Sequence, residues 1–476
     1  MTIEFTSLEK KLTGVVSAAA RELGMPCYLV GGFIRDRLLQ RPSKDMDIVC
    51  IGDGITLAQA VAQRLGGGTE VTVFRNFGTA HLGYRQQETV FNIEFVGARK
   101  ESYRIDSRKP EVSPASLEED LDRRDFTINS LAVSLNEADA GILIDRFRGL
   151  DDLEKRLIRT PGDPGITFSD DPLRMMRAAR FSSQLDFKVA PETLTAIQQE
   201  ASRIMIISTE RISDEFNKIL LSPRPSIGLD ILYKTEILKI IFPQLTDLAG
   251  VEMMEGKGHK DNFYHTLQVL DNISRHTDDL WLRWAALLHD IGKPATKKYE
   301  TGHGWTFHGH DALGGKMVPR IFSRFKLPQH EAMRFVRKLV ELHLRPISLS
   351  KEDITDSAMR RLLFDAGNDI EALMTLCEAD ITSKNEIKVK RYLRNFELVR
   401  QRLKEVEAKD RIRNWQPPVS GEMIMETFHI PPGRLVGDLK TAIREAILDG
   451  VIGNNYEEAY TFMIQKGVEM NLSPIK

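Results

Sequence analysis

Two short apolar runs in the first hundred residues carry acids at fixed positions. The first run, KDMDIVCI at 44–51, alternates Asp45 and Asp47 with apolar residues, and the second, TVFNIEFV at 89–96, places Glu94 inside an apolar segment. Both patterns predict β-strands, so Asp45 and Asp47 leave the same face of the first strand. A carboxylate within an apolar strand is costly unless a cation meets it. We therefore expect these acids to gather on one face of a sheet.

The remaining pattern predicts an α+β protein. Strand-like and helical segments alternate up to about residue 150, with glycine-rich turns such as 66–68, and apolar residues then recur at helical spacing. Nine of the eleven histidines lie between His259 and His343, and a proline-rich break follows at 415–418. We expect a small α/β head, then an all-α neck and body. The predicted parts are residues 1–150 (head), 151–250 (helical neck), 251–415 (histidine-rich helical domain) and 416–476 (C-terminal helical tail).

Composition restricts the class of protein. A chain of 476 residues that is 42% hydrophobic is too long for one core. Its three cysteines lack the spacing of a disulfide or metal-binding pair, which is typical of reduced thiols. The sequence shows neither the pattern of a signal peptide nor an apolar run of about 18 residues. We expect a cytoplasmic protein with no membrane partner. The net charge of −2 does not indicate nucleic-acid binding, so an RNA surface requires local charge such as the basic segment 388–413, which a solvated helix explains equally well.

The paired carboxylates suit a magnesium site. Mg²⁺ usually takes one or two carboxylates plus substrate phosphates, and the backbone N–H groups of Gly31 and Gly32 can meet such phosphates. An isolated Asp-x-Asp is commonly a surface feature, so we infer a metal site here only because a third acid accompanies it. Acids on neighbouring strands can hold two metal ions that activate a hydroxyl and steady a leaving pyrophosphate. The pattern indicates nucleotidyl transfer with Asp45, Asp47 and Glu94 as candidate catalytic residues.

Ordered motifs along nearly the whole chain resemble the class II tRNA nucleotidyltransferases, the CCA-adding enzymes, whose head is shared with bacterial poly(A) polymerases. LVGGFIRD at 29–36 with DMD at 45–47 resembles the first motif, and RRDFTINS at 123–130 resembles the second. The segments 144–153 and 209–218 resemble the hinge and last neck motifs, to which we assign no chemistry. The resemblance implies a five-stranded polymerase-β-like head, ATP and CTP as substrates, Mg²⁺ as cofactor and a tRNA 3′ end as partner.

The first two motifs supply candidate nucleotide-binding residues in the head. The resemblance implies that the second motif contacts ribose and triphosphate. Arg124 offers a fixed fork of donors to phosphate, while Asp125 and Asn129 can exchange hydrogen bonds with ribose hydroxyls. A capped helix start explains the same acid structurally. The candidates are Gly31, Gly32, Arg35, Arg124, Asp125 and Asn129.

The segment DDPLR, which begins at Asp170, resembles the family's base-selecting Glu-Asp-x-x-Arg. Asp171 can accept from the exocyclic amine of C or A while Arg174 donates to the adjacent ring nitrogen, whereas U and G present the reverse polarity. Asp170 stands where the family has glutamate, and its effect on selectivity is open. A proline-initiated helix with a basic stripe explains the pattern structurally. We include Arg177 and Arg180 of that stripe, with Asp171 and Arg174, among the nucleotide-binding candidates.

AALLHDIGKP at 285–294 resembles the signature of HD-family phosphohydrolases. An adjacent His and Asp at a helix end can reach one divalent metal, and Lys293 can meet a phosphate. The candidate ligands of a second divalent metal, of the transition type, are His265, His289, Asp290 and Asp380, with His310 and His343 as additional candidates. Resemblance to long CCA-adding enzymes implies phosphatase or 2′,3′-cyclic phosphodiesterase activity. A degenerate, metal-free tRNA-binding body is the alternative.

The sequence thus predicts a template-independent tRNA nucleotidyltransferase that adds or repairs the 3′-terminal CCA from CTP and ATP, with an HD phosphohydrolase. Poly(A) polymerase is one alternative, although the segment 74–80 lacks the basic signature expected in that branch. Addition of CC only or A only is a second alternative. A metal phosphohydrolase with a nucleotide-binding head and an RNA-binding or chaperone module are further ones. Oligomeric state and the activity and metal of the HD site are open.

Overall fold

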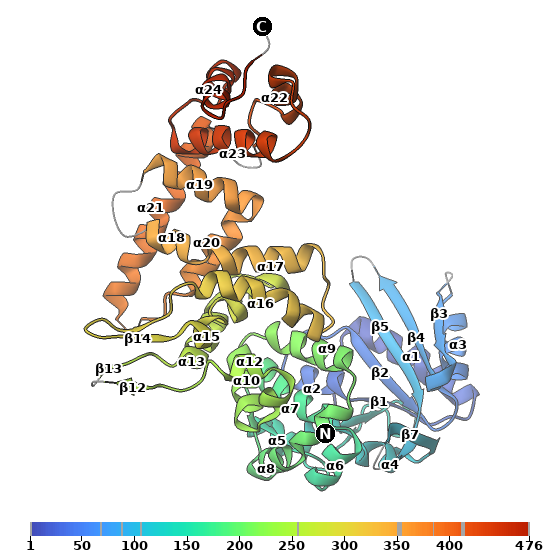
Figure 1. Ribbon diagram of the computed structural model, residues 1–476. Helices are drawn as coiled ribbons and strands as arrows, with labels where there is room; N and C mark the ends of the chain where they lie inside the picture. The colour runs from blue at the N-terminus through green and yellow to red at the C-terminus, as the bar shows by residue number, and fades with distance from the viewer. Residues whose placement is uncertain are drawn as a thin grey trace. The chain divides into compact units, whose positions relative to one another are not determined.

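The computed structural model describes residues 2–66, 69–86, 89–104, 107–254, 257–349, 355–383, 385–410 and 415–474. The chain forms two compact units, Met1–Pro243 and Gln244–Lys476, each of which is described by itself (Figure 1). Two residues of the expected glycine turn, Gly67 and Gly68, and the basic residues at 411 and 413 lie outside the described residues.

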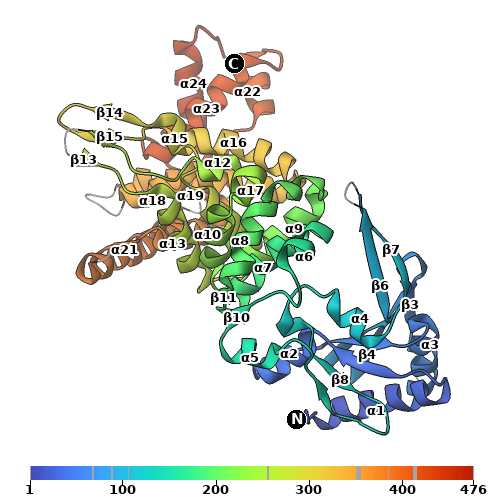
Figure 2. The same cartoon turned by 90° about the horizontal axis from the view of Figure 1, so that it is seen from below.

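A mixed seven-stranded sheet forms the head of the first unit (Figures 1 and 2). Its order is β3 (Val71–Phe74), β4 (Thr79–Gln86), β5 (Thr89–Gly97), β2 (Asp45–Cys50), β1 (Cys27–Val30), β8 (Ala132–Ser134) and β9 (Leu143–Ile144). Only β2 and β5 pair in parallel; the other neighbours are antiparallel. The sheet is wider than the five strands expected, and the short strands β8 and β9 extend it beyond β1.

The head also contains a separate hairpin and six helical segments. They are β6 (Arg99–Arg104) with β7 (Ser107–Pro114), α1 (Ser7–Glu22), α2 (Gly32–Leu38), α3 (Gly54–Leu65), α4 (Leu117–Asp122) and the 3-10 turn η2 (Thr127–Asn129), with η1 (Arg75–Phe77) between β3 and β4. Val30, Val49 and Ala132 from the sheet pack with Leu117 and Leu121 of α4. This core holds α4 against β1, β2 and β8 and so fixes the second motif beside the strand that carries Asp47.

Helices follow in the rest of the first unit. They are α5 (Gly149–Glu154), α6 (Pro164–Asp170), α7 (Leu173–Leu185), α8 (Pro191–Glu200), η3 (Ala201–Ile206), α9 (Thr209–Leu220), α10 (Pro225–Lys234) and α11 (Ile237–Ile241). α7 is almost entirely buried and packs on α9 and α10. A Cβ at Gly228 of α10 would lie 2.5 Å from Ser183 Oγ, so this approach requires glycine. Two short strands, β10 (Leu157–Ile158) and β11 (Lys188–Val189), interrupt the expected all-α pattern.

The second unit is mainly helical. Its helices are α12 (Pro243–Thr246), α13 (Asn262–Ser274), α14 (Leu280–Leu288), α15 (Lys293–Thr296), α16 (His310–Arg324), α17 (Glu331–Leu342), α18 (Leu344–Leu349), α19 (Asp356–Ala366), η4 (Gly367–Asp369), α20 (Ile370–Ala379), α21 (Glu386–Asp410), α22 (Gly421–Phe428), α23 (Arg434–Asp449) and α24 (Tyr456–Glu469). Two small hairpins pair β12 (Met253–Met254) with β13 (Lys257–Gly258) and β14 (Lys298–Glu300) with β15 (Gly304–Thr306). The α+β class is confirmed.

The expected basic segment begins within α21. Two of its cations are already in ion pairs, because Arg400 contacts Glu378 at 3.0 Å and Arg402 contacts Asp356 at 2.7 Å. These two residues therefore join α21 to α20 and α19. Among the described residues, no helix has the length and apolar character needed to cross a bilayer.

Candidate functional sites in the head and the HD domain

The three predicted catalytic acids share one face of the sheet. In the parallel pairing of β2 with β5, Asp47 stands opposite Glu94 and Asp45 opposite Asn92, whose amide donates to Asp45 Oδ1 at 2.9 Å. Met46 and Ile48, on the other face, are each 1% exposed. Because paired positions of neighbouring strands project their side chains to the same side, the carboxylates of Asp45, Asp47 and Glu94 gather as the sequence predicts.

The electrostatics of this face favour a bound cation. Burial raises the pKa of Asp47 to about 6; Arg124 opposes this shift, and the carboxylates of Glu94 and Asp45 add to it. The carboxylates are thus only partly neutralised by protein groups. Hard carboxylate oxygens grouped in this way fit a divalent cation such as Mg²⁺, whose charge would offset the repulsion.

His81 is a member of this face that sequence reasoning missed. It lies on β4 opposite Glu94, and its Nε2 is 3.4 Å from Glu94 Oε1. Only the antiparallel register of β4 and β5 brings the two together. The spacing of His81 and Glu94 along the chain contains no signal for this contact.

The Gly31 backbone brings Arg124 to Asp47. Gly31 has φ of 76°, and a Cβ there would lie 3.3 Å from both Arg124 Nη1 and Asp47 Oδ2. Arg124 is in turn held by Asp120, which is fully buried and lies 3.1 Å away. Sequence reasoning missed Asp120, although its position four residues before Arg124 in α4 is a detectable ion-pair spacing.

A chain of polar contacts joins the first two motifs to the stripe on α7. Arg35 Nη1 donates to Asn129 Oδ1 at 2.7 Å, and Asn129 Nδ2 donates to Asp125 Oδ1 at 3.0 Å. Arg177 lies 2.6 Å from Asp125 Oδ2. Burial alone would raise the pKa of Asp125, yet Arg177 and Asn129 hold it at about 2. Asp125 is therefore ionised and fixes both neighbours.

Phe181 gathers three guanidinium groups around one ring. Arg180, Arg35 and Arg177 lie 4.5, 5.0 and 5.4 Å from the ring centre. Arg180 also pairs with buried Glu215 at 3.0 Å. Neither Phe181 nor Glu215 was a candidate, since an aromatic residue on a helix and an acid 35 residues away carry no joint pattern.

The side chains of Asp171 and Arg174 have different partners in this conformation, although the Arg174 N–H donates to the Asp171 carbonyl at 3.0 Å. Arg174 Nη2 donates to the carbonyl of Arg123 at 2.6 Å. Asp171 Oδ1 accepts from the N–H of Leu173 at 3.2 Å, and its Oδ2 lies 3.7 Å from Arg211. Both side chains thus have other partners near the start of α7. Asp170 is the last residue of α6.

The predicted HD ligands come together in the second unit. On one side of Asp290, His289 and His265 Nε2 lie 3.3 and 3.6 Å from Oδ2, and Lys293 Nζ lies 2.6 Å from the same oxygen. His265 also lies 2.8 Å from Asp380. His265, His289 and Asp290 could share one metal ion, because one ligand atom of each lies within 4.8 Å of the others.

The other Asp290 oxygen faces two further histidines. His310 and His343 Nε2 lie 3.3 and 4.0 Å from Oδ1. Asp290, 1% exposed, thus belongs to two adjacent groups of candidate ligands. The four predicted ligands and the two additional candidates lie in this cluster, which we call the HD cluster: His265, His289, Asp290, Asp380, His310 and His343.

The imidazole rings are oriented for metal binding. The Nδ1 atoms of His289, His310 and His343 contact backbone carbonyls at 2.7 or 2.8 Å. Their Nε2 atoms are buried and lack a hydrogen bond to any described residue. Burial would lower the pKa of His289, but the neighbouring Asp290 carboxylate raises it to about 8, which shows that this position favours a positive charge. This donor set fits a divalent transition metal.

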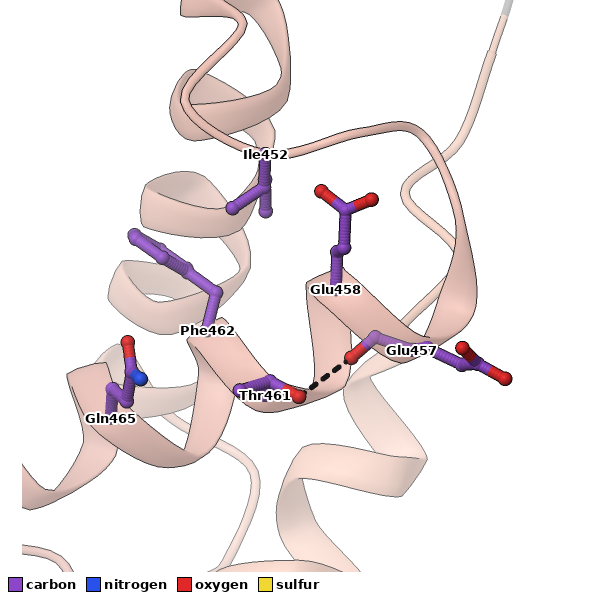
Figure 3. A pocket seen from close by; sticks show the side chains of 6 residues that line it. All are labelled: Ile452, Glu457, Glu458, Thr461, Phe462 and Gln465. Atoms are coloured by element: carbon purple, nitrogen blue, oxygen red, sulfur yellow. Dashed lines mark hydrogen bonds between the residues drawn. The ribbon is translucent and has the colours of Figure 1, made fainter.

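A hollow near the C-terminal end is lined in part by acidic residues and belongs to neither site. It has a volume of about 260 Å³ and is lined by residues of α24 and the loop before it, including Phe462, Glu457 and Glu458 (Figure 3). Glu458 accepts from the N–H of Gly453 at 2.6 Å. Two carboxylates would repel a phosphate, so this hollow does not suit a nucleotide.

Three family descriptions match the chain in order. Residues 27–159 match the poly A polymerase head domain, 186–248 a probable RNA and SrmB-binding site of polymerase A, and 262–384 the HD domain. An A-adding tRNA nucleotidyltransferase of Deinococcus radiodurans is 33% identical over 358 residues, covering 72% of this chain and 78% of the relative. The chain belongs to the tRNA nucleotidyltransferase family.

Further similarity agrees with this membership. A multifunctional CCA protein of Pseudomonas fluorescens is 31% identical over 77% of this chain and 87% of its own. The fold is similar to that of the Bacillus stearothermophilus CCA-adding enzyme in complex with CTP, with a TM-score of 0.67, 24% identity and coverage of 98% and 99% of the two chains. The protein is therefore a nucleotidyltransferase with an HD domain, and divalent metals are general in both families.

Proposed function

We propose that this protein adds or repairs the 3′-terminal CCA of tRNA from CTP and ATP without a nucleic-acid template, in the cytoplasm. The observation that carries the proposal is the pairing of Asp47 with Glu94 across β2 and β5, with Arg124 beside Asp47. The names of the two relatives and the CTP complex of the similar fold support the choice of tRNA and nucleotide.

In the proposed reaction, the tRNA 3′ hydroxyl oxygen forms a bond to the α-phosphorus of the nucleotide and the bond from that phosphorus to the α,β-bridging oxygen breaks. Pyrophosphate leaves, and the hydroxyl proton passes to water. Mg²⁺ held by Asp45 and Asp47 would make the hydroxyl more acidic and neutralise charge on the leaving group. Glu94 assists by completing the carboxylate face opposite Asp47. The aligned strands β2 and β5 fix these oxygens in advance, which reduces the entropy cost of reaching the reactive geometry.

The residues around this face hold the nucleotide. Gly31 donates its backbone N–H to the carbonyl of Leu131 at 3.1 Å, so the expectation for this glycine is wrong and we assign the triphosphate contact to the N–H of Gly32. Arg35 and Arg124 supply positive charge. Asp125 and Asn129 contact the ribose. The hydrogen bond of Asn129 to Arg35 also positions that guanidinium.

Base selection is assigned to the start of α7. Asp171 and Arg174 present an acceptor and a donor to the edge of C or A, and Arg177 and Arg180 complete the basic stripe behind them. For this role the contacts of Arg174 with the Arg123 carbonyl and of Asp171 with Arg211 must be exchanged for contacts with the base. Nucleotide binding thus includes a local rearrangement.

The HD cluster gives a second proposed activity, hydrolysis of phosphate esters at damaged RNA 3′ ends. His265, His289, Asp290 and Asp380 hold a divalent transition metal, and His310 and His343 extend the ligand set. Such a metal makes a bound water more acidic. Water adds its oxygen to phosphorus, the ester P–O bond breaks, and a proton passes to the leaving oxygen. Lys293, beside Asp290, binds the phosphate.

The polymerisation proposal is tested with three tRNA transcripts that lack CCA, CA or only the final A. Each is incubated with Mg²⁺ and CTP, ATP or both, and products are resolved on a sequencing gel. We expect one to three additions in the order C, C, A, and no addition to a complete tRNA. Extension of only the transcript ending in CC would instead give the A-adding activity named for the Deinococcus relative. Long A tails on unrelated RNA would contradict the proposal.

A further inference from the structure

A small cavity lies next to the HD cluster and has no role in the function proposed above. Its volume is about 170 Å³, and it is lined by loop 247–252, His259, Asn262 and, from the other side, Pro294, Lys297 and Phe307. Pockets for drug-sized ligands usually measure about 300 to 1,000 Å³. The cavity therefore suits one ring system and is too small for an oligonucleotide.

Phe307 and Lys293 connect this cavity to the HD cluster. The ring of Phe307 lines the cavity, and its carbonyl contacts His310 Nδ1 at 2.7 Å. Lys293 Nζ lies 2.6 Å from Asp290 and 5.5 Å from the centre of the Phe307 ring. A phosphate at Lys293 can therefore carry a substituent that enters the cavity.

Aromatic rings form one wall of the cavity and its border. The ring of His259 meets the rings of Trp305 and Phe307 almost at right angles, with centroids 5.5 and 5.8 Å apart. His259 is fixed because its Nε2 accepts from the N–H of Glu252 at 3.3 Å and its Nδ1 contacts the carbonyl of Lys260 at 2.8 Å. All three rings are half-buried. Such rings suit a flat aromatic ligand, and nucleobases of every kind stack on aromatic side chains.

Polar groups at the cavity match the edge and charge of a nucleotide. Asn262 is 7% exposed, lines the cavity and makes no side-chain hydrogen bond within the described parts of the chain. Its amide can both donate to and accept from a base edge. Lys297 Nζ lies over the Trp305 ring at 5.3 Å and pairs with Glu252 at 2.6 Å, which places a cation at the border.

We propose that this cavity binds the nucleobase of a nucleoside phosphate whose phosphate lies at Lys293 and the HD cluster. The proposal rests on the hydrolase function stated above and narrows its substrates. The HD site then prefers esters that carry a base, such as nucleoside 2′,3′-cyclic phosphates, over base-free phosphate esters. The base contributes to substrate binding through stacking and through Asn262.

Binding is tested first, with adenosine and the full-length protein in a chelator. All four tryptophans, at 281, 284, 305 and 415, belong to the second unit, so their fluorescence reports on that unit. We expect adenosine to change the emission of the wild type, Trp305→Phe to lose most of this change, and Asn262→Ala to weaken binding about tenfold. The matched control is His303→Ala, an exposed histidine in the turn of the same hairpin. Equal affinity in Asn262→Ala and wild type, or no binding by the wild type, overturns the proposal.

Hydrolysis rates then test the base-binding cavity and the proposed hydrolase activity separately. The kcat/KM values for 2′,3′-cyclic AMP and for glycerol 1,2-cyclic phosphate are compared with a divalent metal present. We expect the wild type to prefer the nucleotide at least about tenfold through KM, and Phe307→Leu and Asn262→Ala to reduce that ratio. Equal kcat/KM for the two esters contradicts the base-binding cavity while leaving the hydrolase intact. Adenosine binding without hydrolysis of either ester contradicts the hydrolase and supports the cavity.

Discussion

Asp47 combines burial with like-charged neighbours, and this combination gives the residue a measurable signature. Its pKa of about 6 lies above the ordinary 3.8, chiefly because burial disfavours the carboxylate. The folded, metal-free protein therefore binds the proton more tightly than the unfolded chain does. The protonated Asp47 side chain therefore contributes to the free energy of unfolding at low pH, and this contribution is lost as the pH rises through about 6.

Asp47→Asn should stabilise the metal-free protein at pH 7.5 and not at pH 4. Asparagine resembles the protonated carboxyl at every pH. The free energy of unfolding at pH 7.5 should therefore be about 1 to 3 kcal/mol higher in the variant than in the wild type. Thermal unfolding in EDTA at both pH values measures it. Added Mg²⁺ should raise the melting temperature of the wild type and not that of the variant. A variant less stable than the wild type at pH 7.5 in EDTA would contradict the account of this face.

The alternation of Asp45 and Asp47 with apolar residues was sufficient to predict the carboxylate face, because side chains alternate along a strand whatever its neighbours are. His81 could not be predicted in this way. Its contact with Glu94 depends on the register of β4 and β5, which long-range pairing sets. Asp120 was within reach of prediction, since its partners are three and four residues away.

At the scale of elements, Asp125 joins three segments of the first unit. It contacts Asn129 of η2, which holds Arg35 of α2, and it pairs with Arg177 of α7. The pKa of Asp125 is depressed to about 2, so its contribution is present above the ordinary value of 3.8 and is lost as the pH falls toward 2. This residue ties η2 and α2 to α7.

Asp125→Ala should destabilise the first unit by about 2 to 4 kcal/mol at pH 7, because Arg177 loses its carboxylate partner. Urea unfolding followed by far-UV circular dichroism reports on both units, whereas tryptophan fluorescence reports on the second alone. The dichroism transition should shift and the fluorescence transition should not. Asp122→Ala is the control, since Asp122 and its partner Arg146 are both 46% exposed and such pairs contribute at most about 1 kcal/mol. Equal shifts in the two variants would contradict this role.

Segment-level prediction succeeded for helices and failed for side-chain partners. Regular apolar spacing predicted a helical neck, and α7 is its buried centre. The same sequence did not reveal that Phe181 collects Arg35, Arg177 and Arg180, or that Arg174 contacts a backbone carbonyl of the head. These contacts join elements that are far apart in the sequence, and the spacing of apolar residues within one element does not predict how such elements pack.

At the scale of the whole molecule, the chain carries two sets of candidate metal ligands in two compact units. The carboxylate face suits a hard cation and a triphosphate, whereas the imidazole-rich HD cluster suits a transition metal. Short motifs located the core pair of each set, Asp45 with Asp47 and His289 with Asp290, whereas the resemblance placed the HD residues that lie further along the chain. The further division of the chain into four parts stays a prediction.

The most direct test measures both reactions on the same preparations of two variants. Asp47→Ala should lower CTP incorporation into a tRNA transcript lacking CCA by about a thousandfold or more while phosphate-ester hydrolysis continues, and His289→Ala should do the reverse. His308→Ala, an exposed histidine of the second unit, is the control. Incorporation by Asp47→Ala at the wild-type rate would contradict the central claim that the carboxylate face of β2 and β5 performs nucleotidyl transfer.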